Sequence, residues 1–239
     1  MQCEIRSIIG TRKEQQDHAG CVRDEKGMLA VVCDGIGSRA DGGASAKTAV
    51  DMYTDLFLKT DFGSFAEFIV SATEEINEVI RRDYGKDCGT TVVLAFVSGD
   101  SLQWLSVGDS RLYIKRGRKF RKITNDHNYK YILDVRMKKG LIDKETYDNE
   151  IERGEHLASF LGMGVIDIMD INVTPLTLEK GDMLLLMTDG IYKILSEETM
   201  NDILESNDDI NSVADELIRS VEQSGSTDID NATFAVIKY

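Results

Sequence analysis

The stretch MLAVVCDG, residues 28–35, decides the fold, and MLLLMTDG, residues 183–190, has the same plan. Each is a short apolar run rich in Val or Leu that ends in Asp-Gly, a pattern typical of a buried strand that reaches the edge of the fold. A carboxylate at such a strand end is costly unless a cation neutralises it. A third acidic residue, Asp230, precedes the last apolar run of the chain. We therefore expect Asp34, Asp189 and Asp230 to meet at a site for a hard metal ion.

The overall charge narrows the classes of partner. Of 239 residues, 42 are acidic and 28 are basic, which gives a net charge of −14. Such a surface repels phosphate backbones and anionic lipids, so nucleic acid and membrane partners are disfavoured. No apolar stretch approaches about 18 residues, and the first residues lack the plan of a signal peptide. We expect a cytoplasmic monomer whose residues 1–239 form a single domain.

The cysteines Cys3, Cys21, Cys33 and Cys88 have no CxxC spacing and stand mostly in apolar, strand-like contexts. This pattern indicates reduced core thiols, not metal ligands or a disulfide framework.

The order of elements predicts the fold class. Several strands in succession, joined by short turns, favour antiparallel pairing over strand-helix-strand alternation. The sequence predicts an α+β fold of two packed antiparallel sheets with helical layers outside, and a polar, helical appendage that is broken near Gly140. Strands are predicted at 3–9, 19–23, 28–33, 90–97, 102–107, 112–115, 120–123, 168–175, 183–188 and 232–238. Helices are predicted at 44–58, 65–82, 196–205 and 210–223, and two short ones within 128–155.

The glycine-rich stretch GIGSRA, residues 35–40, superficially fits a dinucleotide-binding fingerprint, with Asp55 twenty residues past its first glycine. The match fails because Asp34 would point at the pyrophosphate and because the downstream chain lacks repeated strand-helix-strand units.

A second candidate motif is GTRKEQQD, residues 10–17. The guanidinium of Arg12 presents a fork of donors that matches phosphate oxygens, and the carboxylate of Asp17 can hold a metal ion or its water. Alone, an Arg near an Asp is a common surface pair, so the motif gains weight only together with the other aspartates.

Together these motifs resemble the metal-dependent serine/threonine phosphatases of the protein phosphatase type 2C family. They occur in the order of that family and span the chain from Gly10 to Val236. The matches are RKEQQD at 12–17, VCDG at 32–35 with GGAS at 42–45, CGTT at 88–91, VGDSR at 107–111, TNDH at 124–127, FLG at 160–162, GD at 181–182 with TDG at 188–190, and DNAT at 230–233.

The resemblance implies a four-layer αββα sandwich with a small flap subdomain at about 128–158, and a role for each matched residue. Asp34 resembles the carboxylate that bridges two Mn²⁺ or Mg²⁺ ions, and the Gly35 carbonyl resembles a ligand of one of these ions. Asp189 and Asp230 resemble ligands of the other ion, and Asp109 resembles a residue that helps to hold a third, weaker ion. Asp17 resembles an acceptor for metal-bound water, and Arg12 resembles the residue that binds the substrate phosphate.

The chemistry of the donors agrees with this resemblance. Carboxylates and carbonyls without His or Cys favour Mg²⁺ or Mn²⁺ over Zn²⁺. Two ions roughly 3.5–4 Å apart can activate a bridging water in line with the phosphorus, so no protein nucleophile is needed. The expected reaction is hydrolysis of phosphoserine or phosphothreonine on proteins that a serine/threonine kinase has modified.

Three departures from the family pattern bear on the mechanism. Ile36 stands where many eukaryotic members carry a His that protonates the leaving oxygen, while bacterial relatives often have Met, so the bacterial type is favoured. Gln16 stands where an acidic residue is common, which removes one charge near the metal ions. Residues 157–160, LASF, replace the usual Arg-bearing sequence, which implies different substrate recognition by the flap.

Two other classes of function fit part of the pattern. A catalytically weak or silent relative would bind phosphoproteins as a regulator without turnover, and the intact aspartates disfavour it. A glycosidase with paired carboxylates would work without metal. Hydrolysis of an aryl phosphate with and without a chelator separates all three.

Two further motifs are given structural roles. The basic run KRGRK, residues 115–119, is interpreted as a solvated hairpin tip, and His127 as a cap of the turn into the appendage.

Overall fold

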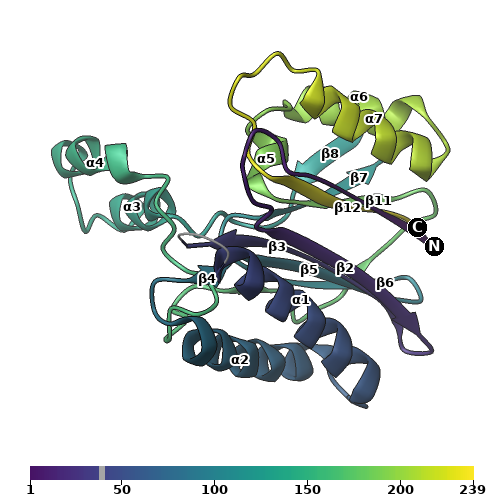
Figure 1. Ribbon diagram of the computed structural model, residues 1–239, viewed down its shortest axis with the longest axis horizontal. Coiled ribbons are helices and arrows are strands. Elements are labelled where there is room, and N and C mark those ends of the chain that lie inside the picture. Colours follow the sequence, from purple (N-terminus) through teal and green to yellow (C-terminus); the bar gives the residue numbers. More distant parts are fainter. Residues whose placement is uncertain (38–40) are drawn as a thin grey trace.

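The computed structural model describes residues 1–37 and 41–239, and in it two β-sheets lie face to face with helices on both outer sides (Figure 1). Helices α1 and α2 cover one sheet, and α6 and α7 cover the other. A separate pair, α3 and α4, projects from one end of this sandwich.

The first sheet contains five strands within the described residues, in the order β1-β12-β11-β7-β8. Every neighbouring pair in it is antiparallel. Its last strand in sequence, β12, therefore lies between the first strand and β11. The strands are β1 (Gln2–Ile8), β7 (Arg111–Arg116), β8 (Lys119–Lys122), β11 (Met183–Met187) and β12 (Ala232–Lys238).

The second sheet contains seven strands within residues 1–37 and 41–239, with β10-β6-β5-β3-β2 as its main path. The short strands β4 and β9 pair with β3 and β6, and all of these pairs are antiparallel. The strands are β2 (Asp17–Asp24), β3 (Gly27–Ile36), β4 (Gly89–Thr90), β5 (Val92–Ser98), β6 (Ser101–Val107), β9 (Asp170–Ile171) and β10 (Leu176–Thr177).

The helices that cover the sheets bury one apolar stripe each, as periodic spacing predicts. In α2, the stripe contains Ile69, Ile76 and Ile80, which have no exposed surface. This helix begins where the Ser64 hydroxyl accepts a hydrogen bond from Glu67 N at 3.4 Å, and it ends at Gly85, whose φ is 81°. The covering helices are α1 (Asp41–Lys59), α2 (Phe65–Tyr84), α5 (Asp189–Tyr192), α6 (Glu197–Ser206) and α7 (Ile210–Glu222).

The core has one apolar layer between the sheets and one beneath each helical layer. The central layer joins Val32 and Val93 of the second sheet to Leu186 and Ala235 of the first, all without exposed surface. Truncating such a leucine to alanine typically costs about 2–5 kcal/mol of stability. Because strands and helices segregate into these layers, the predicted α+β sandwich of two antiparallel sheets flanked by helices is confirmed.

The appendage consists of α3 (Tyr129–Lys138), α4 (Lys144–Glu150) and a 3-10 turn, η1 (Ile151–Arg153). The predicted break falls at Gly140, whose φ of 68° suits glycine. At its base, His127 N donates to Gly108 O at 2.9 Å and Ala158 N donates to His127 O at 2.9 Å. The two ends of the appendage thus leave the sandwich at the same place, beside the loop between β6 and β7 (Figure 1).

The strand predicted at 168–175 is wrong over most of its length, because Asn172 interrupts the ladder. Its side-chain oxygen accepts a hydrogen bond from Trp104 N, and its amide nitrogen donates to the carbonyls of Leu102 and Thr174 at 3.2 and 3.1 Å. A side chain therefore takes the backbone partners that a continuing strand would use. Only the two-residue strands β9 and β10 remain around it.

The basic run at 115–119 is more than a solvated tip. Lys115 is buried, and its ammonium donates to Gly117 O at 2.8 Å. Arg116 pairs with buried Asp182 at 2.6 Å, which ties the β7-β8 hairpin to the turn before β11. Only the remaining part of the run fits the prediction.

No helix in residues 1–37 and 41–239 combines the length and the apolar composition that a membrane span requires.

Candidate active site

The aspartates predicted from the sequence come together at one end of the two sheets. Asp34 of β3 lies opposite Asp17 of β2 in the antiparallel register. Asp109 follows β6, Asp189 opens α5 directly behind β11, and Asp230 precedes β12. Electrostatic coupling joins all of them, because the charges of the other four each raise the pKa of Asp34. Segments that are far apart in the sequence thus deliver one acidic cluster.

The cluster carries more negative charge than its surroundings balance. Desolvation raises the pKa of Asp34 well above its usual range, and the charges of Asp17 and Asp189 add to that effect. Burial also raises the pKa of Asp17 to about 7 and that of Asp109 to about 6. A bound cation would favour the ionised form of these carboxyl groups, because it would neutralise the repulsion between them. The cluster is therefore suited to binding a cation.

The donor set fits a hard divalent ion that keeps part of its water. In the described part of the chain, no three His, Cys, Asp or Glu side chains are gathered closely enough to hold one ion by themselves. Mg²⁺ is commonly bound through one or two carboxylates, with water in its other positions. A set of aspartate oxygens spread around a partly accessible centre suits that mode better than a closed cage.

Asp17 is fixed from the opposite sheet by Thr188, a residue to which the sequence analysis gave no role. The Thr188 hydroxyl donates to Asp17 Oδ2 at 2.9 Å. The hydroxyl oxygen of Thr188 itself accepts a hydrogen bond from Thr233 N at 3.0 Å. Asp17 is 2% exposed and Thr188 has no exposed surface. The only sequence signal for this bond was the position of Thr188, directly before Asp189.

Arg12 lies at the rim of the cluster, where the sequence places a phosphate clamp. Its Nη2 donates to Asp230 Oδ2 at 2.7 Å, and the two side chains are 51% and 39% exposed. The guanidinium is therefore both next to a candidate metal ligand and open to an incoming substrate.

Asn231 holds the loop that carries Arg12 in place. Its side-chain nitrogen donates to Ile9 O at 2.9 Å and to Glu14 O at 3.0 Å, and its side-chain oxygen accepts from Gln16 N at 2.7 Å. One side chain thus clamps both ends of the loop. The sequence motif contained Asn231, but its clamping role could not be inferred from the motif.

Gly35 stands where three segments cross. A Cβ atom there would lie 2.3 Å from Gly42 O and 2.6 Å from Gln16 O, so no larger residue fits. The predicted role of its carbonyl as a metal ligand stays a prediction. The dinucleotide-like stretch continues from here into Ser38, Arg39 and Ala40, which lie outside the described residues.

The loop that carries Asp109 is held from several sides. Tyr192 of α5 donates its hydroxyl to Asp109 O at 3.1 Å, and the guanidinium of Arg111 lies 3.4 Å from the centre of the Tyr192 ring. Arg111 also forms a two-point ion pair with Asp126, at 2.9 and 2.8 Å. His127 has no exposed surface, and its Nδ1 accepts a hydrogen bond from the preceding Gly108 N at 3.2 Å. Its ring therefore supports the Asp109 loop, in addition to marking the turn into the appendage.

His18 is directed away from the cluster. It follows Asp17 on β2, and successive side chains of a strand point to opposite faces. Gly20, two residues further along and on the same face of β2, lies against Val50 and Thr54 of α1. Burial and the charge of Lys47 on that helix lower the pKa of His18.

Lys193 is a cation within the cluster that sequence reasoning missed. Its ammonium lies 2.5 Å from Asp189 Oδ2, one helical turn back in the chain. Its charge also acts on Asp109, whose pKa it lowers in opposition to burial and to Asp189. The spacing of four residues could have signalled the pair, but such pairs are common on exposed helices.

Comparison with known proteins identifies the family of the chain. A family model described as Protein phosphatase 2C matches residues 6–232. The chain is 27% identical over 249 residues to "Serine/threonine phosphatase stp" of Listeria welshimeri, covering 100% of this chain and 96% of that protein. It is 23% identical over 247 residues to "Protein phosphatase PhpP" of Streptococcus pneumoniae, covering 99% and 97%.

The fold has solved counterparts. The serine/threonine phosphatase of S. agalactiae superimposes with a TM-score of 0.84 and 24% sequence identity, covering 100% of both chains. The match to the family model extends over nearly the whole sandwich and includes the segments that carry all of the clustered aspartates. The chain therefore belongs to the protein phosphatase 2C family of metal-dependent serine/threonine phosphatases, and it is of the bacterial type.

Proposed function

We propose that the chain hydrolyses phosphoserine and phosphothreonine esters on proteins with the help of two Mn²⁺ or Mg²⁺ ions. One observation carries the proposal: aspartates from both sheets converge at one end of the sandwich, with the guanidinium of Arg12 at their rim. Asp34, the Gly35 carbonyl, Asp189 and Asp230 would hold the two ions, and Asp109 would help to hold a third, weaker one.

The bound ions would supply an activated water and neutralise the charge that develops on the phosphate. The protein would orient that water through Asp17, because Thr188 fixes one carboxylate oxygen from the opposite sheet. Burial keeps Asp17 in one orientation, which suits a group that positions a small molecule.

Arg12 would bind the phosphate group of the substrate. A guanidinium has five N–H donors in a rigid fork, of which the bond to Asp230 uses one. Two parallel hydrogen bonds to phosphate oxygens are the usual use of such a fork. The Asn231 clamp would keep the fork at the rim while substrates exchange.

Departure of the seryl or threonyl oxygen requires a proton, and the side chain of Ile36 cannot donate one. We therefore expect esters of acidic alcohols, which leave without protonation, to be the faster substrates.

The biological setting follows from the same proposal. The substrates would be phosphoproteins produced by a serine/threonine kinase, and the chain would act as a cytoplasmic monomer. Residues 1–239 would work as one catalytic domain, with 128–158 as a flap beside the site. The bonds of His127 to Gly108 and Ala158 support this placement, because they root the flap next to Asp109.

The decisive experiment is hydrolysis of a phosphoserine peptide and of p-nitrophenyl phosphate, with Mn²⁺ and with excess chelator, by the wild type and Asp34→Asn. We expect turnover by the wild type with Mn²⁺ alone. Binding of the phosphopeptide without turnover would identify a silent, phosphoprotein-binding relative. Turnover that survives the chelator would exclude the two-metal proposal.

A further inference from the structure

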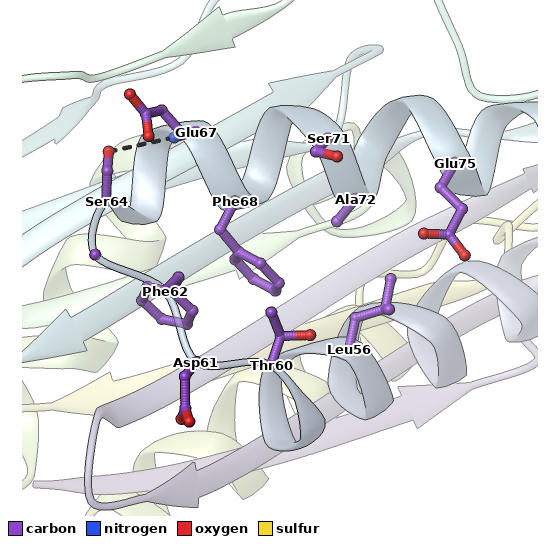
Figure 2. A pocket seen from close by; sticks show the side chains of 11 residues that line it. Leu56, Thr60, Asp61, Phe62, Ser64, Glu67, Phe68, Ser71, Ala72 and Glu75 are labelled. Carbon is purple, nitrogen blue, oxygen red and sulfur yellow. Dashed lines mark hydrogen bonds between the residues drawn. The ribbon is translucent and has the colours of Figure 1, made fainter.

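A groove lies between the end of α1 and the start of α2, and the proposed reaction does not use it (Figure 2). Its volume is about 360 Å³, within the range of sites that bind ligands or side chains. Leu56 of α1 and Phe62, Phe68 and Ala72 from the following loop and helix supply its apolar lining.

The apolar wall of this groove is preformed. Phe62 and Phe68 are stacked, with ring centres 4.6 Å apart, and both are only partly buried. Phe62 also packs edge-on against Phe65 and Phe96, at 5.9 and 5.8 Å. The loop is fixed as well, because Lys26 Nζ donates to Thr60 O at 3.2 Å. A rigid aromatic surface of this kind loses little entropy when it binds a partner.

The rim of the groove is acidic. Asp61, Glu67 and Glu75 line it and are exposed, and no basic residue stands among its lining residues. In residues 1–37 and 41–239, none of these three carboxylates has a hydrogen-bond or ion-pair partner. By contrast, Asp55 on the nearby turn of α1 is paired with Lys59 at 2.7 Å. The unpaired rim therefore favours a positively charged partner.

The groove is remote from the aspartate cluster. Helix α1 starts at Asp41, close in sequence to Asp34 and Gly35, and its 19 residues end at Lys59 beside the groove. At 1.5 Å per residue, the helix separates the two places by about 28 Å. A phosphate ester in the active site cannot reach the groove, but another segment of the same substrate can.

We propose that this groove docks a basic segment with a large apolar side chain, located in the phosphoprotein substrates at a distance from the phosphorylated residue. The apolar side chain would enter between Leu56, Phe62 and Phe68, and flanking Lys or Arg residues would face the acidic rim. This inference rests on the proposed phosphatase function, because only a phosphatase would use the groove to dock its phosphoprotein substrates. An extended chain spans about 3.3–3.6 Å per residue, so roughly eight or more residues must separate the segment from the phosphoserine.

The test uses synthetic phosphoserine peptides that carry the segment Lys-Arg-Leu-Lys-Phe-Arg behind a Gly/Ser linker of about 14 residues or of about 1 residue. A third peptide carries the long linker and Ser in place of Leu and Phe. With Mn²⁺, we expect the long-linker peptide to show a kcat/KM about tenfold above the other two, through a lower KM, because docking raises its local concentration. Equal values for the three peptides would overturn the proposal.

Two charge-reversal variants locate the effect. Asp61→Lys/Glu75→Lys removes rim carboxylates, whereas Glu74→Lys/Glu78→Lys makes the same change in net charge at exposed positions of α2 that do not line the groove. We expect only the first variant to lose the advantage of the long-linker peptide, while both hydrolyse p-nitrophenyl phosphate at the wild-type rate. An equal loss in both variants would show a general charge effect and refute the docking site.

Binding is also measured without catalysis, by the fluorescence anisotropy of the labelled, unphosphorylated segment. If the segment binds specifically but the protein hydrolyses no phosphate ester, the docking proposal is supported and the proposed phosphatase function is refuted. Binding that leaves the kinetics unchanged would refute substrate docking. Sedimentation of the wild type as a dimer that Asp61→Lys/Glu75→Lys dissociates would assign the groove to a second copy of the chain and overturn our proposal.

Discussion

Thr188 and Asp17 are joined by a hydrogen bond of 2.9 Å that crosses from one sheet to the other. Asp17 begins a strand of the second sheet, whereas Thr188 follows a strand of the first. Because both residues are buried, neither has water as an alternative partner. The bond therefore couples the packing of the sheets to the orientation of a carboxylate in the candidate active site.

The first prediction concerns this bond. Thr188→Val keeps the shape of the side chain but leaves a buried carboxylate oxygen without its donor, so it should destabilise the protein by about 1–3 kcal/mol. It should also lower kcat, because Asp17 loses its fixed orientation. Urea denaturation and steady-state kinetics measure the two effects. Thr188→Ser restores the hydroxyl and should recover most of both, and a serine variant no better than valine would contradict this account.

The second prediction concerns Asp34. Asp34→Asn should abolish the Mn²⁺-dependent activity, yet the metal-free variant should melt higher than the metal-free wild type, because one of several mutually repelling charges is gone. A gain of about 1 kcal/mol corresponds to roughly 2–4 °C in a chain of this size. Calorimetry with and without Mn²⁺ provides the measurement. A variant that Mn²⁺ stabilises as much as it stabilises the wild type would show that Asp34 is not a ligand.

The third prediction concerns Arg12. Arg12→Ala should raise KM for phosphoserine peptides several-fold and leave Mn²⁺ affinity nearly unchanged, because we propose that the guanidinium binds the ester and not the ions. Stability should change by less than about 1 kcal/mol, because the pair with Asp230 is largely exposed. Lys13→Ala, at the exposed neighbouring position, is the matched control. If both variants have the same KM, Arg12 is an ordinary surface residue.

The fourth prediction concerns Lys193. Its ammonium bonds to Asp189 Oδ2, the group proposed to bind an ion, so the lysine would compete with the metal for that oxygen. Lys193→Met should therefore strengthen Mn²⁺ binding, and Lys193→Arg, which keeps the charge, should not. Isothermal titration calorimetry gives the dissociation constants. Weaker binding by the methionine variant would mean that Lys193 holds the ligands in place instead of competing for them.

The fifth prediction concerns Ile36. An aryl phosphate has a leaving group that departs without a proton, whereas a seryl oxygen needs one. Ile36→His should therefore raise kcat/KM for phosphoserine peptides more than for p-nitrophenyl phosphate, at saturating Mn²⁺. The ratio of the two constants over several pH values is the test, with Ile36→Met as the control. A constant ratio would show that position 36 does not limit protonation.

The sequence predicted what depends on local pattern. The apolar runs that end at Asp34 and Asp189 form buried strands, because alternation and turn signals act over a few residues. The strand predicted around Asn172 failed because a side chain took the ladder bonds of Leu102 and Trp104, some seventy positions away in the chain. Rules that act over a few neighbouring residues cannot predict a hydrogen-bond partner so far away in the sequence.

The same limit separates the predicted from the missed residues of the site. Asp34 and Asp189 were found because an acidic residue after an apolar run is unusual in itself, whereas the role of Asp109 was implied only by the family resemblance. Thr188 and Asn231 are ordinary residues at ordinary positions, and their importance depends on which backbone groups the fold brings beside them. Lys193 was missed for a related reason, since only the folded cluster distinguishes it from a common surface lysine.

The clamp of Asn231 on the loop at residues 9–16 joins the two ends of the chain, across 215 to 222 positions. During synthesis, the loop that carries Arg12 therefore leaves the ribosome 215 or more residues before this partner. The strand β12, which fills the gap between β1 and β11, arrives at the same late moment. A nascent chain therefore contains Asp17 and Asp34 long before the loop of Arg12, the proposed phosphate-binding residue, is held in place. We therefore expect a fragment that stops before Asn231 to lack phosphatase activity, because neither the clamp nor β12 is present in it.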